Sequence, residues 1–228
     1  MLILVAHGTR SAAGLQTIGE IVEAVSARIG PLRTAFVDVL GPNPAELLAG
    51  AGESAIVMPA FLASGYHVHT DLPARIAESG HVDTRVTQAL GPDPVLATVM
   101  CERLIEVGWR PGDVVVMAAA GSSDPRAGRD VYCAATMLGR HVGEVHVGFV
   151  ATGAPRVHDV VRVLRANGRR RILVAPYLLA RGLFHDRLTE CGATAVAAPL
   201  GAHPGVVDVI GMRFARVHAE ASGYPPRA

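Results

Sequence analysis

The chain begins Met1-Leu-Ile-Leu-Val-Ala-His-Gly-Thr-Arg10, in which an unbroken apolar run passes directly into a polar loop. The run lacks the alternating pattern of a half-exposed strand, and a helical pattern of apolar residues follows from Leu15 to Ile29. Continuous apolar strands joined by helices are typical of a parallel sheet that is covered on both faces. The opening of the sequence therefore predicts the first strand and the first helix of an α/β fold.

The same order of short apolar runs and helical patterns continues along the chain. Strands are predicted at Leu2–Ala6, Ala35–Leu40, Ala55–Leu62, Val86–Leu90, Asp113–Ala119, Val145–Ala151, Arg171–Leu179 and Thr194–Pro199. Helices are predicted at Leu15–Ile29, Pro44–Ala51, Leu72–Glu78, Val95–Val107, Arg126–Val142, Val157–Asn167 and Val206–Ala219. This order predicts two units, each a four-stranded parallel sheet with helices on both faces.

The two halves of the sequence share similar short segments at the ends of their predicted strands. The matching pairs are Ala6–Arg10 with Ala119–Ser123, Leu40–Pro44 with Thr152–Pro155, Val57–Gly65 with Val174–Gly182, and Leu90–Pro94 with Leu200–Pro204. The offset stays between about 110 and 117 residues, and the pairs occur in the same order, which indicates a duplicated unit. We predict an N-terminal unit at residues 1–109 and a C-terminal, degenerate unit at residues 110–228.

Composition and charge exclude several classes of function. The 21 basic and 20 acidic residues give a net charge of +1, and the longest basic run is Arg169–Arg171, so we expect no nucleic-acid partner. The apolar runs are far shorter than the roughly 20 residues of a membrane-spanning helix, and the N-terminus has the pattern of a strand and not of a signal peptide. We therefore expect no membrane insertion. The three cysteines lack a C-x-x-C pair, which disfavours a disulfide framework and a thiolate zinc site and favours a cytoplasmic location.

The sheet topology predicts where a site should lie. Ligands of open parallel sheets bind beyond the carboxyl ends of the strands, where the strand order reverses, and here that point falls between the first and third strands of each unit. In the first unit these strands end at the loops that carry His7 and His67. The repeat places Ala120 and Phe184 at the same positions of the second unit. Because the scaffold was kept and the histidines were not, we interpret the pair as chemical, although drift at two solvent-facing positions is the alternative.

Two imidazoles from two strand ends suit a transient metal. Neutral imidazole binds first-row divalent metals and titrates near neutral pH. A structural zinc site usually closes with four protein ligands, whereas two ligands leave coordination positions open, as a metal that is handed on requires. The same imidazoles could accept protons from a substrate.

The residues around this pair leave alternatives open. His69 is either an outer partner of His67 or an exposed bystander. Asp71 is either a helix cap ahead of Leu72 or part of a metal site. Arg10 binds either an acidic group of a substrate or a carboxylate of the protein surface. The remaining histidines are interpreted as surface or structurally satisfied residues: His81, His141, His146, His158, His203 and His218.

At these residues the sequence resembles the class II sirohydrochlorin chelatases, and most of all their long, actinobacterial two-unit form. The matching segments are Leu2–Arg10, Pro59–His67 with Asp71–Pro73, and Pro176–Gly182. The resemblance covers nearly the whole chain, including its duplication. It implies an enzyme, a lyase, that inserts a divalent metal into sirohydrochlorin without ATP.

The resemblance also implies roles for single residues. The two metal-binding and catalytic histidines of the family fall on His7 and His67, and the first is also the proton acceptor. The macrocycle would lie near Asn43, where some members carry an acid, and against the loop formed by Leu62, Ala63, Ser64, Gly65 and Tyr66. Arg10 would face the carboxylates of the substrate. The expected partners are sirohydrochlorin and the metal, with no cofactor beyond that substrate metal, and the chain would be a monomer or a homodimer.

Three other functions compete with insertion of Fe2+ to give siroheme, which is favoured by analogy with the siroheme that aerobic organisms use for sulfite or nitrite reduction. A cobaltochelatase of cobalamin biosynthesis would use the same imidazoles for Co2+. A carrier of metal or tetrapyrrole would also use them, but without turnover. The segment Leu4–Arg10 is also similar to the histidine-phosphatase signature, but Ala6 stands where that signature has the arginine that binds phosphate.

Overall fold

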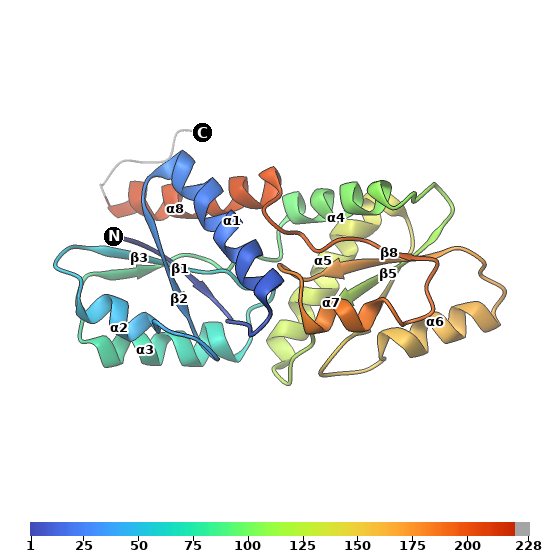
Figure 1. The fold of residues 1–228 in the computed structure, drawn as a ribbon, viewed down its shortest axis with the longest axis horizontal. Coiled ribbons are helices and arrows are strands. Elements are labelled where there is room, and N and C mark those ends of the chain that lie inside the picture. The colour runs from blue at the N-terminus through green and yellow to red at the C-terminus, as the bar shows by residue number, and fades with distance from the viewer. Residues whose placement is uncertain (222–228) are drawn as a thin grey trace.

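The computed structural model describes residues 1–221, which form two four-stranded parallel sheets side by side (Figure 1). The strand order is β2-β1-β3-β4 in the first sheet and β6-β5-β7-β8 in the second. The strands are β1 (Leu2–Ala6), β2 (Leu32–Phe36), β3 (Ala55–Pro59), β4 (Thr84–Val86), β5 (Val114–Ala119), β6 (Val145–Phe149), β7 (Ile172–Tyr177) and β8 (Ala195–Val196). The predicted α/β class, with two duplicated four-stranded parallel units, is confirmed.

Helices connect the strands and cover both faces of each sheet. They are α1 (Ala12–Ile29), α2 (Pro44–Ala49), α3 (Leu72–Ser79), α4 (Pro94–Glu106), α5 (Pro125–Val142), α6 (Val157–Ala166), α7 (Leu183–Leu188) and α8 (Pro204–Ala221), with a π-helical turn, η1 (His67–Asp71), before α3. No helix within residues 1–221 is both long and apolar enough to cross a membrane.

The central strands are apolar throughout because both of their faces are buried. In β1, Ile3 and Val5 pack with α2 and α3, whereas Leu4 and Ala6 belong to the larger core on the opposite face. All residues of β3, β5 and β7 are buried. This packing explains the absence of a polar alternation in the sequence.

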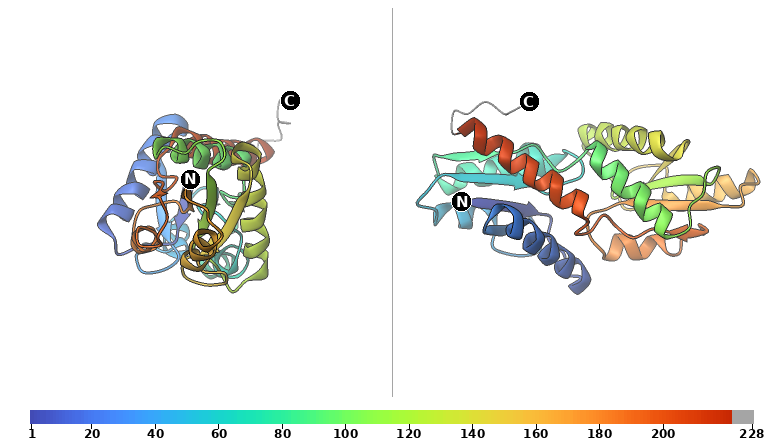
Figure 2. Two further views of the ribbon diagram at one scale, coloured as in Figure 1. Left: turned by 90° about the vertical axis from the view of Figure 1, so that its right-hand side faces the viewer. Right: turned by 90° about the horizontal axis from the view of Figure 1, so that it is seen from above.

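The last helix of each half covers the sheet of the other half. Helix α4 packs on β7 and α5 of the second sheet, and α8 packs on β3 and α1 of the first. Figure 2 shows α8 in red over the first sheet and α4 in green over the second. The largest hydrophobic cluster therefore draws residues from both halves. The boundary between the two repeated units, at residues 109 and 110, stays a prediction. In space the two halves share a core.

The first strand has its predicted bounds, Leu2–Ala6, and among the others the second, fourth and eighth differ most from theirs. The prediction of a second strand to Leu40 is wrong, because the chain turns after Phe36: Leu40 N donates to Asp38 O over 2.8 Å, and Val39 has a φ of 68°. The fourth and eighth strands are shorter than predicted. The fourth begins two residues earlier, at Thr84, and ends at Val86, and the eighth ends at Val196. The backbone beyond them stays beside the neighbouring strand, with bonds such as Leu90 N to Pro59 O, but forms no regular ladder.

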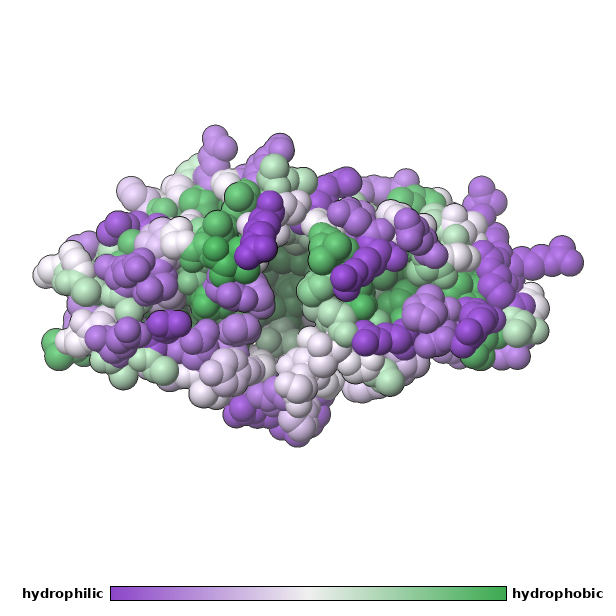
Figure 3. All heavy atoms as spheres, turned by 60° about the horizontal axis from the view of Figure 1, so that its bottom comes forward, coloured by the Kyte–Doolittle hydropathy of each residue, from purple (hydrophilic) through white to green (hydrophobic). Residues whose placement is uncertain are grey.

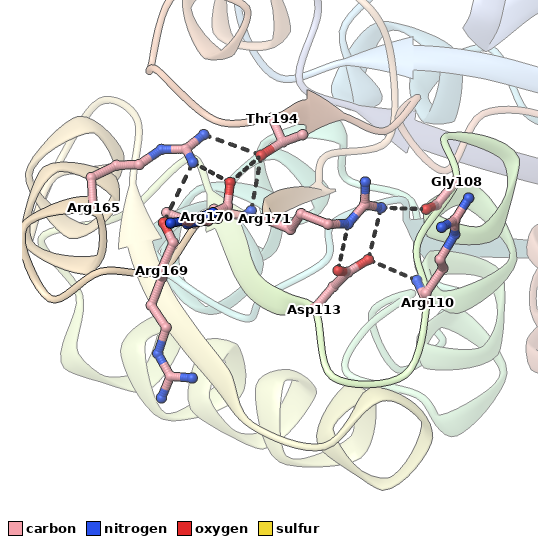
Figure 4. Close-up of polar contacts among 9 residues, drawn as sticks. Gly108, Arg110, Asp113, Arg165, Arg169, Arg170, Arg171 and Thr194 are labelled. Atoms are coloured by element: carbon pink, nitrogen blue, oxygen red, sulfur yellow. Dashed lines mark hydrogen bonds and ion pairs between the residues drawn. The ribbon is translucent and has the colours of Figure 1, made fainter.

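The basic run Arg169–Arg171 serves the fold at the amino end of the second sheet (Figure 4). The guanidinium of Arg171 binds both carboxylate oxygens of Asp113, at 2.6 and 3.0 Å, and also Gly108 O. Arg165 donates to the carbonyl of Arg170 and to Thr194 Oγ1. Hydrogen bonding from Arg171 holds the pKa of the Asp113 carboxyl below its ordinary value of 3.8.

We expect Asp113→Asn to lower the free energy of unfolding at neutral pH by about 1 to 2 kcal/mol, because it removes a charge-assisted pair at a nearly buried carboxylate. Since the folded-state pKa of Asp113 is lowered, this stabilisation is present above the ordinary pKa of 3.8 and is lost as the pH falls through the folded-state value. Denaturant unfolding of both proteins between about pH 7 and pH 3 should show the difference narrowing in acid.

Asp159→Asn is the matched control, because it removes a more exposed pair with Arg162 and should change the free energy of unfolding by less than about 0.5 kcal/mol. Equal losses in the two variants, or a difference that widens in acid, would contradict the role of Asp113.

Candidate metal and substrate site

The carboxyl ends of the two sheets face one another between the halves (Figure 1). The strand order reverses between β1 and β3 in the first sheet and between β5 and β7 in the second, as predicted. Polar contacts join the facing loops, for example Tyr177 OH to Leu62 O at 2.7 Å. Figure 3 shows the molecule hollowed between its two halves, with a hydrophobic floor to the hollow. This cleft is where the topology places a ligand.

The structure brings His7 and His67 together at this cleft. The centroids of their rings are 4.8 Å apart, and the ring planes are almost perpendicular, at 83°. His7 follows β1 directly and is exposed, while His67 opens the η1 turn and has a side chain that is 31% exposed. Within residues 1–221, no group of three or more His, Cys, Asp or Glu side chains is placed to hold a metal. The pair is therefore a sparse donor set that would leave most coordination positions of a metal open.

A glycine turn sets the position of His7. Gly8 has a φ of 85°, and a Cβ at this position would lie 2.0 Å from Asp38 O, so no other residue fits here. The second half repeats the turn at Gly121, where φ is 92° and a Cβ would lie 1.6 Å from Thr152 O. The backbone that presents His7 is thus duplicated, although Ala120 stands at its position in the second half.

Three side chains orient the ring of His67. Phe61 stacks on it, with ring centroids 5.7 Å apart and planes at 13°, and Tyr66 meets it edge-on at 5.7 Å. Its Nδ1 lies 3.0 Å from Oδ2 of Asp71. Because an ionised carboxylate only accepts hydrogen bonds, Nδ1 of a neutral His67 is the donor and Nε2 presents its lone pair to a ligand.

Asp71 makes this contact and does not cap the helix that follows. The structure gives it helical backbone angles and no capping hydrogen bond from its side chain, which is only 15% exposed. Arg75 approaches its other oxygen at 3.5 Å. The η1 turn closes through Leu72 N and His67 O, and this wider turn carries both His67 and Asp71. The predicted helix cap is therefore absent, and the contact with His67 is of the kind that carboxylates often make to metal-binding histidines.

The other predicted residues differ in their exposure and in the contacts that they make. Arg10 is exposed in the loop after His7, and no carboxylate of residues 1–221 forms an ion pair with it. His69 is exposed and interacts electrostatically with Asp124 of the second half, whose pKa is lowered to about 2, chiefly by hydrogen bonds from Arg126. Asn43 lies beyond β2, and its side-chain oxygen accepts from Glu46 N at 3.0 Å in a capping box. That oxygen is therefore committed to the start of α2.

The loop predicted to line the macrocycle follows β3 and is held against the second half. Leu62 O accepts from Tyr177, Ser64 N donates to Asp130, and Gly65 is buried. Ala63 packs on the core, and Tyr66 is 58% exposed. Sequence reasoning gave no role to Phe61, although it lies within the quoted motif, or to Asp130 and Tyr177, which no spacing connects to the loop.

A second hollow lies at the opposite edge of the first sheet. It has a volume of 420 Å3 and is lined by the segments 48–49, 51–54 and 79–83. Its one histidine, His81, bonds to Thr84 Oγ1 and Glu53 O. Because this hollow lies at the amino ends of the strands, it is remote from the histidine pair.

Comparison with known proteins agrees with the duplication. The family model described as CbiX matches the chain twice, at residues 1–107 and 114–217. The chain belongs to the CbiX family. Similar proteins include a sirohydrochlorin ferrochelatase of Priestia megaterium, 24% identical over 92% of this chain and 87% of the relative. A sirohydrochlorin cobaltochelatase of the same organism is 25% identical over 83% of this chain and 67% of the relative.

Solved structures of other proteins share the fold. SirB from Bacillus subtilis with Fe3+ superposes with a TM-score of 0.82 at 23% identity, over 97% of this chain and 96% of that chain. SirB from Bacillus subtilis subspecies spizizenii in complex with cobalt gives a TM-score of 0.77 at 20% identity, with the same coverage of both chains. Two different metals thus occur with this fold.

We expect Asp71→Ala to weaken binding of Co2+ about 10- to 100-fold, because His67 loses the partner that fixes its tautomer and its ring orientation. Titration of the apoprotein with Co2+, followed by calorimetry, measures this change. Asp83→Ala, at an exposed position beside β4, is the matched control and should leave the affinity unchanged. Equal affinities in the Asp71 variant and the wild type would contradict the contact's role.

Proposed function

We propose that this protein is a sirohydrochlorin chelatase, a lyase that inserts Fe2+ into sirohydrochlorin without ATP and gives siroheme. The observation that carries the proposal is the pair of perpendicular imidazoles, 4.8 Å apart, at the meeting point of two parallel sheets. The sirohydrochlorin chelatases among the similar proteins support the substrate. The choice of Fe2+ over Co2+ rests on analogy, because imidazole accepts both metals.

In the proposed mechanism, His7 and His67 hold the metal through one nitrogen each, and water occupies the positions that the protein leaves open. The macrocycle lies along the loop from Leu62 to Tyr66, where its pyrrolic nitrogens displace these waters. The ring releases two N–H protons as the divalent metal enters it, so the net charge of the reactants is conserved. Once the metal has left His7, the nitrogen that held it accepts one of these protons, since no other residue within residues 1–221 forms a hydrogen bond with this ring, and the second proton passes to solvent.

A single chain supplies both walls of the proposed site, so the reaction needs no second copy of the protein. Arg10 at the rim is free to meet a carboxylate of the substrate. The cobaltochelatase alternative uses the same residues with Co2+, and the presence of a cobaltochelatase among the similar proteins keeps it open. A carrier would bind metal or tetrapyrrole stoichiometrically and would not release a metallated product repeatedly.

We expect His7→Ala and His67→Ala each to lower the rate of metal insertion at least 100-fold, because a single imidazole neither holds the metal nor supplies the proton acceptor. The measurement is anaerobic insertion of Fe2+ and of Co2+ into sirohydrochlorin, followed by absorbance. The two wild-type rates also rank siroheme formation against cobalt insertion.

His141→Ala is the matched control, since His141 is exposed on α5 and should be dispensable. A wild-type rate equal to the uncatalysed rate with both metals would refute the chelatase proposal, and stoichiometric binding without turnover would favour the carrier.

A further inference from the structure

The loop from Leu62 to Tyr66 is fixed by two polar contacts that both come from the second half of the chain. The hydroxyl of Tyr177, at the end of β7, donates to Leu62 O over 2.7 Å. The carboxylate of Asp130, on α5, accepts from Ser64 N over 2.7 Å. These two bonds bridge 115 and 66 residues of sequence. We call Tyr177 and Asp130, with these two bonds, the strut.

Tyr177 is the buried member of the strut, whereas Asp130 is half-buried. Tyr177 is 3% exposed, and burial raises the pKa of its hydroxyl, so that it remains a neutral donor. Gly91 makes room for the bond, because a Cβ there would lie 2.3 Å from Tyr177 Oη and 2.5 Å from Leu62 O. Loss of this donor would leave the carbonyl of Leu62, which is partly buried, without the hydroxyl that it accepts from.

The strut has no counterpart on the other side of the duplicated frame. By the matched register of the two sheets, Tyr177 corresponds to Ala60. Helices α1 and α5 have the same length, and Asp130 corresponds in them to Thr17, whose hydroxyl donates to Ala13 O of its own helix. The equivalent loop of the second half nevertheless packs closely on α1, where a Cβ at Gly14 would lie 2.9 Å from Arg181 O. The frame therefore places such a loop without a strut.

The strut contacts the first half of the molecule, which is also the half that carries the histidine pair. Of the two equivalent loops, both within residues 1–221, the one that leads into His67 receives it. Phe61 and Tyr66, which contact the His67 ring, flank the two residues that the strut holds. Fixing Leu62 O and Ser64 N therefore fixes the two aromatic walls of His67 and, through them, its distance from His7.

We propose that the second half, which lacks the histidine pair, contributes Asp130 and Tyr177 as positioning residues that hold His67 and the substrate loop for metal insertion. The inference rests on the proposed function for its catalytic readout, but its effect on metal binding does not depend on turnover.

The test compares Tyr177→Phe and Asp130→Ala with the wild type in two assays: the affinity for Co2+ alone, and kcat and KM for Co2+ insertion into sirohydrochlorin. We expect each variant to bind Co2+ about 3- to 10-fold more weakly and to lose about 10-fold in kcat, while thermal unfolding shows a folded protein at the assay temperature. Asp130→Asn retains a side-chain oxygen that accepts from Ser64 N and should recover most of both values. Tyr132→Phe, at an exposed tyrosine on α5, is the matched control and should behave as the wild type.

The outcomes separate the inference from the function on which it rests. Weaker Co2+ binding in both strut variants, without catalysed insertion by the wild type, would support the strut and reject the chelatase. Catalysed insertion by the wild type with unchanged Co2+ affinity and kcat in both variants would overturn the strut alone. Lower thermal stability with unchanged Co2+ affinity and kcat would assign the two bonds to folding only, and absence of Co2+ binding by the wild type would overturn both proposals.

Discussion

Helix α8 leaves the second half of the chain to cover the first sheet, while α4 leaves the first half to cover the second. Five side chains of α8 are almost fully buried there: Val206, Val207, Val209, Ile210 and Phe214. Burial of this many apolar side chains is worth on the order of 10 kcal/mol, so the halves are held with the carboxyl ends of their strands facing each other. The cleft, the convergence of its loops and the site within it all depend on this exchange.

Duplication within one chain allows the two copies of a unit to diverge in chemistry while they keep one frame. The glycine turns at Gly8 and Gly121 are geometrically equivalent, but only the first presents a histidine. Tyr177 and Asp130 occur only in the second copy and contact the loop of the first. In the proposed account one copy carries the metal-binding groups and the other holds them in position. Two identical units could not divide these roles between them.

The central strands were predictable because burial on both faces requires a continuous apolar run. Such a run marks the position of a strand in the sequence whatever its neighbours are. The bounds of the edge strand β2 were predicted wrongly because the chain turns at Asp38. The backbone of Asp38 packs against Gly8, which lies thirty residues away in sequence and gives no local signal of the turn. Convergence of His7 and His67 followed from sheet topology alone. The role of Asp71 stayed open because a spacing of four residues suits a helix cap and a histidine partner equally well. The helix exchange and the contacts of Tyr177 and Asp130 carry no local signal, since apolar helix faces fit either sheet.

The central claim is that one metal ion binds between His7 and His67 at the cleft. Anomalous diffraction at the cobalt absorption edge, from crystals soaked with Co2+, tests it most directly. The account predicts a single strong peak at about 2.1 Å from one nitrogen of each imidazole, as is usual for metal–imidazole bonds, with water in the remaining positions. A metal bound elsewhere, or bound by only one of the two histidines with the other turned away, would contradict the account.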